Sequence, residues 1–160
     1  NVSLPAEPTL AQLEEVGLFS VAQTAAPVTT AAQVAEDAGV ALVDGVWTQQ
    51  WVITDLDADT IAGNQMLAVA ALQADIVQQT QNRLDDFART RNYDGILSAC
   101  TYATSAVPKF QSEGQYAVNA RDATWATLYT LMAEVEAGTR PMPTSFDDVE
   151  PSLPQLTWPL

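Results

Sequence analysis

The sequence predicts an α+β protein, in which a small β-rich N-terminal module with a hairpin precedes a mainly helical half with a long helix and an extended, proline-rich C-terminal arm. Asp44-Gly45 stands between two apolar runs, which is a strong signal for a β-hairpin. Residues 60–92 and 112–137 carry apolar side chains at three- and four-residue spacing, as helices do. Five prolines within residues 139–160 preclude regular structure there.

The N-terminal module, residues 1–56, is predicted to hold one short helix and three or four strands. Thr9 and Gln12 have the spacing of a capping box, so we expect a helix from Leu10 to Val16, with Gly17 ending it. So few strands provide only a thin core. The strands are expected over residues 18–21, 30–36, 40–43 and 46–54.

Two tryptophans lie on the strand that follows the predicted hairpin turn. Strict alternation places Trp47, Gln49, Trp51 and Ile53 on one face of that strand. Two indoles of roughly 200 Å² each are too large to be left in water without consequence, so this face covers either a core or a partner. We take Trp47, Trp51 and Ile53 as candidate partner-binding residues, and the core alternative stays open.

The helical domain, residues 57–138, opens with Asp57 and Asp59 at positions where helix N-caps are favoured. The stripe of apolar residues along the predicted helix over 60–92 is narrow. A narrow stripe suits a helix that packs on one neighbour in its own chain, or on copies of itself around a symmetry axis.

Two further helices are expected in this domain. Asp94 follows a break and is expected to cap a short helix that reaches residue 103. Pro108 is expected to interrupt the chain again. Ser112 and Gln115 then have the spacing of a second capping box, which predicts that the next helix begins there and stops at Gly138.

The C-terminal arm, residues 139–160, carries more large hydrophobic side chains than a disordered tail usually holds. An extended arm that lies in a groove uses such side chains as anchors, and the groove belongs either to this chain or to another one. We take three anchors as candidate partner-binding residues: Phe146, Leu156 and Trp158.

The balance of charge limits the classes of partner. Six basic residues stand against 20 acidic ones, and residues 1–82 contain ten carboxylates and no cation. Such a surface repels phosphate backbones and anionic lipid, so we expect neither nucleic acid nor membrane as a partner. An acidic surface that keeps the protein soluble is the ordinary explanation, and a basic protein partner is the alternative.

The residue types also limit the chemistry. The chain has no histidine, which removes Ser-His-Asp and Cys-His nucleophile systems and the usual proton shuttle. Cys100 stands among apolar neighbours and is expected to be a small buried hydrophobe. Residues 55–59 imitate the start of a calcium loop, but Thr60 and Met66 occupy the positions that require glycine and glutamate, so helix capping explains these aspartates better. We therefore expect no metal, no cofactor and no catalytic activity; a glycosidase-type carboxylate pair is the enzymatic alternative.

Several stretches of the chain resemble bacteriophage tail-fibre assembly proteins and fibre tips. The sequence DGVWTQQW, residues 44–51, continues into VITDL and a helix, and residues 8–19 are similar to the opening of the same module. Residues 121–143 and 153–159 resemble the C-terminal half of related phage tail proteins.

This resemblance implies a chaperone that binds the distal part of a trimeric tail-fibre protein and covers its hydrophobic surface while the fibre folds. It implies a place in the bacterial host cytoplasm during assembly, with retention on the virion tail as an option. The alternative is a permanent structural subunit or tip of the tail fibre or baseplate that takes part in host recognition, and a homo-oligomer is open in either case.

Overall fold

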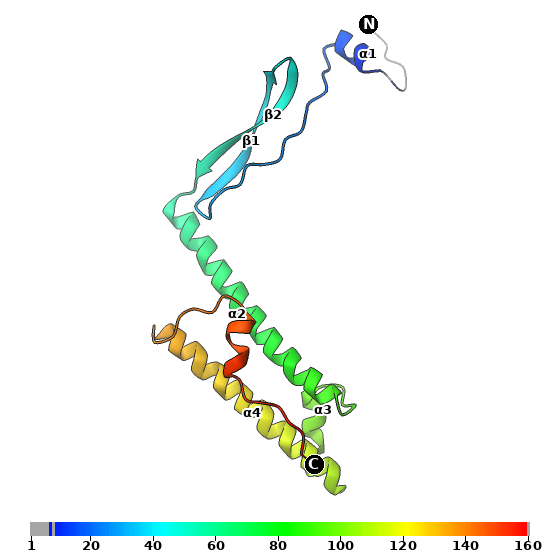
Figure 1. Cartoon of the computed structure of the whole chain (residues 1–160), viewed down its shortest axis with the longest axis vertical. Helices are drawn as coiled ribbons and strands as arrows, with labels where there is room; N and C mark the ends of the chain where they lie inside the picture. The colour runs from blue at the N-terminus through cyan, green and yellow to red at the C-terminus, as the bar shows by residue number, and fades with distance from the viewer. Residues whose placement is uncertain (1–6, 8, 160) are drawn as a thin grey trace. The chain divides into compact units, whose positions relative to one another are not determined.

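The computed structural model describes Glu7 and residues 9–159, and the chain divides into two compact units, Asn1–Gln65 and Met66–Leu160 (Figure 1). A two-stranded antiparallel hairpin is followed by a mainly helical half, which confirms the predicted α+β class. Within the described residues, none of the helices combines the length and the apolar character that crossing a membrane requires.

The first unit begins with the short helix α1 (Leu10–Glu15). The predicted capping box is confirmed, because the Gln12 N–H donates to Thr9 Oγ1 at 3.4 Å and the Thr9 N–H donates to Gln12 Oε1 at 3.0 Å. Gly17 follows the helix with a φ of +81°, a conformation that glycine adopts without steric cost.

The hairpin pairs β1 (Gln33–Val43) with β2 (Val46–Asp55). Asp44 and Gly45 form its two-residue turn with φ values of +49° and +82°, the positive pair that a type I′ turn requires. The register shifts between Asp37 and Val40, so β1 carries one residue more than β2 at a β-bulge.

Two strand predictions for this unit are wrong. Residues 18–21 form no strand; instead Ala22 makes an isolated parallel bridge with Thr48 of β2. The two strands expected over residues 30–36 and 40–43 are one strand, because the bulge takes up the irregular residues without breaking the pairing. The sheet therefore has two strands, fewer than the sequence suggested.

The long helix α2 (Ala58–Arg89) confirms the predicted one. The Thr60 N–H and hydroxyl each donate to the Asp57 carboxylate at 2.8 Å, so Asp57 is a helix cap, as expected. The elements that follow α2 are α3 (Ile96–Cys100), the 3₁₀ turn η1 (Thr101–Thr104), α4 (Pro108–Glu136) and the 3₁₀ turns η2 (Phe146–Asp148) and η3 (Glu150–Ser152).

One predicted helix cap and one predicted helix start are wrong. The backbone N–H of Ile96 donates to Asp85 Oδ1 at 2.8 Å, so a residue from α2 caps α3 where Asp94 was expected. α4 begins at Pro108, because a first-turn proline needs no hydrogen bond and already has a helical φ. Ser112 therefore lies inside the helix and forms no capping box.

The end of α4 follows the prediction. Gly138 has a φ of +70°, and its N–H donates to the Val135 carbonyl at 3.0 Å. The Thr139 N–H donates to the Glu134 carbonyl at 2.9 Å, which completes a Schellman motif.

The core of the second unit lies between α2, α3, α4 and the C-terminal arm, whose 3₁₀ turns lie against α2 and α4 (Figure 1). The arm is therefore extended only in part. Two clusters of buried side chains form this core. The first is Ile76, Leu128, Leu131, Phe146, Val149 and Leu153, and the second is Leu84, Ala88, Ile96, Ala99 and Ala117.

Candidate partner-binding surface

The hairpin of the first unit exposes hydrophobic side chains on both faces. None of the side chains described for this unit is buried, so the hairpin has no core of its own. We name the exposed aliphatic side chains the hairpin surface; each is 45–59% exposed. Its members are Val40, Leu42, Val43, Val46, Val52 and Ile53.

Trp47 packs against the ring of Phe19. Its ring lies 6.0 Å from that of Phe19, at an interplanar angle of 45°. Phe19 is itself 52% exposed, so the aromatic pair stays in contact with water. Trp47 is therefore half-buried. It is neither fully enclosed in a core nor fully exposed to a partner, the two alternatives that the sequence left open.

Trp51 is held by the chain segment that precedes the hairpin. Its indole N–H donates to Thr24 Oγ1 at 3.0 Å and to the Thr24 carbonyl at 3.3 Å. The Thr24 hydroxyl in turn donates to the Gln49 carbonyl at 3.1 Å. This segment therefore fastens to the edge of β2 and satisfies the polar atom of the indole, as a half-buried tryptophan requires.

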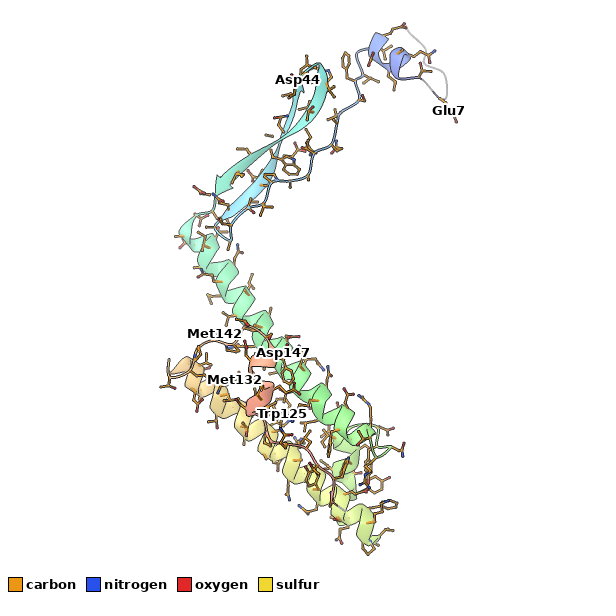
Figure 2. The ribbon with its side chains drawn as sticks, in the orientation of Figure 1. Glu7, Asp44, Trp125, Met132, Met142 and Asp147 are labelled. Atoms are coloured by element: carbon orange, nitrogen blue, oxygen red, sulfur yellow. The ribbon has the colours of Figure 1, made fainter. Side chains whose placement is uncertain are left out.

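The tip and bulge of the hairpin carry negative charge. Asp44 lies at the tip (Figure 2). The Gly39 N–H and the Gln49 side-chain amide donate to the Asp37 carboxylate at 2.7 and 2.8 Å, and these bonds hold the pKa of Asp37 below its ordinary value. Asp37 is thus ionised at neutral pH, and it adds charge beside the hairpin surface.

The arm uses its hydrophobic side chains inside its own chain. Phe146 is 7% exposed in the first core cluster, and Leu156 and Trp158 pack half-buried against the second. Arg83 Nη2 donates to the Pro154 carbonyl at 2.8 Å and fixes the arm on α2. Of the two alternatives for the groove, the structure shows the intrachain one for these three residues.

An apolar pocket of about 240 Å³ lies between α2, α4 and the start of the arm. Met132 and Met142 line it, and Figure 2 shows both residues. Arg140 and Glu136 supply charged groups at its wall. The pocket depends on packing between segments that are distant in the sequence, so it had no sequence signal.

A buried carboxylate of α4 faces the segment that follows α2. Glu113 is 4% exposed, and it pairs with Arg91 Nη1 at 2.9 Å and accepts a hydrogen bond from the Tyr93 hydroxyl at 2.7 Å. Burial, and then the nearby carboxylate, raise the pKa of Tyr93 to about 12. Arg91 and Tyr93 satisfy the charge of Glu113, which gives the group a structural role.

Cys100 packs against the second core cluster but is not fully buried. Burial raises the pKa of its thiol, so the thiolate form is scarce at neutral pH. This environment agrees with the expected role as a small hydrophobe.

Sequence reasoning identified Trp47, Trp51 and Ile53 but missed most of the hairpin surface. The available signal was the thinness of the module, because two strands cannot bury apolar side chains on both of their faces. Comparison with protein families, curated proteins and solved structures finds no match to the chain.

Proposed function

We propose that this protein is a phage tail-fibre assembly chaperone that binds the distal part of a fibre through its hairpin surface, without catalysing a reaction. The exposure of the hairpin surface is the observation that carries this proposal. An isolated two-stranded hairpin is marginally stable in water, and a third strand or a packed helix is needed to stabilise it. A partner that covers these side chains supplies that stabilisation.

The physical task of such a chaperone fits this surface. Fibre strands expose unpaired edges and apolar faces before the trimer forms, and such surfaces aggregate. A complementary hydrophobic patch covers them, and an acidic exterior limits association of the chaperone with itself. The resemblance of residues 44–51 supplies the identity of the partner, and with it the bacterial host cytoplasm as the place of action.

Co-expression of the full chain with the neighbouring fibre protein tests the proposal. We expect soluble fibre to rise and to be captured with the chain. Leu42→Ser should reduce both, whereas the matched control Leu97→Ser should not, because Leu42 and Leu97 are similarly exposed at 59% and 61% but only Leu42 lies on the hairpin.

Equal amounts of soluble fibre with and without the chain, and no capture, would contradict the proposal. Washed virions distinguish the two phage roles. A stoichiometric amount of the protein on them favours a permanent structural subunit, and its loss after assembly favours the transient chaperone.

A further inference from the structure

One edge of the hairpin sheet is occupied by the chain itself. The Ala22 N–H donates to the Trp47 carbonyl at 2.8 Å, and the Gln49 N–H donates to the Ala22 carbonyl at 2.9 Å. These two groups of β2 therefore point away from β1. Thr24, two residues after Ala22, occupies the same edge of β2 through its hydrogen bonds to Gln49 and Trp51.

The register then fixes the direction of the β1 backbone. Leu42 lies opposite Trp47, and Val40 lies opposite Gln49. In an antiparallel pair, opposite residues either exchange both hydrogen bonds or direct both sets of polar groups outward. The backbone groups of Trp47 and Gln49 point away from β1. The backbone N–H and C=O of Leu42 and Val40 therefore point away from β2, toward the outer edge of β1.

This outer edge of β1 has no neighbour among the residues that the structure describes. Val40 and Leu42 also expose half or more of their side chains, 50% and 59%. A row of free backbone donors and acceptors between apolar side chains is the arrangement to which an added β-strand binds.

The charge of this unit indicates whether a second copy of the chain or a different protein binds the outer edge of β1. Residues 1–65 contain nine carboxylates and no lysine or arginine. Glu36 and Asp37 belong to β1 itself, and Asp44 lies at its end. A second copy at this edge would bring like charges together with no cation to pair them, which opposes association.

We propose that the outer edge of β1 receives an extended, apolar strand that carries lysine or arginine from another protein. The added strand pairs with the backbone of Val40 and Leu42, and its cations lie near Glu36, Asp37 and Asp44. This inference rests on the proposed function and specifies its contact: the partner segment is a basic β-strand.

Amide hydrogen exchange measured by NMR on the full chain tests the contact residue by residue. In the free chain the Val40 and Leu42 amides should exchange fast, while the Ala41 amide, which points toward β2, exchanges more slowly. Binding of the fibre protein should slow exchange at Val40 and Leu42 by about tenfold or more, because each gains a backbone hydrogen bond.

A peptide probe makes the test independent of the fibre protein. We expect the Thr-Val repeat peptide Lys-Thr-Val-Thr-Val-Thr-Val-Lys to protect the same two amides, and the version with glutamate at both ends to protect them far less. The difference between the peptides should shrink at high salt, because the interaction of exposed charges is screened.

Two variants separate pairing of the backbone from contact of the side chain. Leu42→Pro removes the outward N–H, whereas the β1–β2 ladder does not use that group, and proline is tolerated on edge strands. Leu42→Thr keeps the N–H and reduces the apolar contact. Leu42→Pro should abolish binding of the Lys-flanked peptide, and Leu42→Thr should weaken it only partly.

The outcomes distinguish this inference from the proposed function. If the fibre protein is captured but Val40 and Leu42 stay unprotected, the edge is not the contact, and the chaperone proposal stands alone. If the Lys-flanked peptide protects both amides but no fibre protein is captured, the edge binds strands and the proposed partner is wrong. Protection that grows with the concentration of the chain alone, or binding to neither probe, would overturn the inference.

Discussion

The indole of Trp158 stacks on the ring of Phe87, with centroids 4.4 Å apart and planes inclined by 13°. The indole N–H donates to Thr90 Oγ1 at 2.9 Å, so the stack is also fixed in orientation. The Thr157 N–H donates to the Tyr116 hydroxyl at 2.7 Å from the side of α4. The end of the arm is thus bound to both long helices of the second unit.

Trp158→Ala should lower the free energy of unfolding of the second unit by about 2–4 kcal/mol, because it removes a large, half-buried aromatic contact. Trp158→Phe is the matched control, since it keeps an aromatic ring for stacking and loses the hydrogen bond and part of the contact area, at a smaller cost of about 1–2 kcal/mol. Urea unfolding followed by far-UV circular dichroism measures both values. An unchanged midpoint for Trp158→Ala would contradict the role of the stack.

Deletion of residues 139–160 should do more than remove a tail. The sequence alone predicts that the helical circular-dichroism signal survives this deletion. The structure predicts its collapse, because the deletion takes three buried side chains, Phe146, Val149 and Leu153, out of the first core cluster. Removal of residues 156–160 alone is the control, and it should weaken the second unit while leaving it folded.

Tyr93 should titrate late. Burial first, and then the Glu113 carboxylate, raise its pKa to about 12, so the folded protein holds this proton more tightly than the unfolded chain, where the tyrosine pKa is about 10. The stability that this group contributes is complete below pH about 10 and is lost as the pH rises toward about 12. Ultraviolet titration of the phenolates should show one late transition.

Two variants assign that transition. Tyr93→Phe should remove it. Glu113→Gln should bring the Tyr93 pKa only part of the way back, because burial, the larger cause, remains. A late transition that persists in Tyr93→Phe would show that another tyrosine produces it.

Local sequence rules predicted the features whose determinants lie within a few residues. The Asp44-Gly45 turn, the Thr9 capping box, the Asp57 cap and the Gly138 stop all follow from such rules. The Asp85 cap on α3 comes from 11 residues away and lies outside their reach. The same distinction holds for the candidate site. The alternation of side chains along a strand predicts that Trp47 and Trp51 share one face, whereas their contacts with residues 19–24 depend on the tertiary fold.

Gly114→Ala should destabilise the second unit by about 1–3 kcal/mol or more, as overpacking does. A Cβ at this position would clash with the backbone nitrogen of Ala103 and the carbonyl carbon of Tyr102, so the backbone would have to move. Gly63→Ala is the control, because no atom beyond the neighbouring backbone of its own helix lies within 4 Å of the added Cβ, and it should stabilise its helix by about 0.5–1 kcal/mol. Thermal unfolding compares the two, and equal melting temperatures would contradict the close approach.

The hairpin should be the least protected structure of the free chain. Its strands have many exposed backbone groups and no buried side chain, which are the features of a segment that opens locally at low free energy. α4, by contrast, contains Leu128 at 1% exposure and the fully buried Ala117. Hydrogen exchange read by mass spectrometry should therefore show residues 33–55 exchanging much faster than residues 117–131.

Binding of the fibre protein should slow hydrogen exchange in residues 33–55 and leave the exchange rates of the second unit unchanged. The reason is thermodynamic: a partner that binds only the ordered hairpin stabilises it by RT ln(1 + [L]/Kd), where [L] is the concentration of free partner. A hairpin that is already as well protected as α4 in the free chain needs no such partner. That result would remove the physical ground for a chaperone that acts through this surface, whatever its sequence resembles.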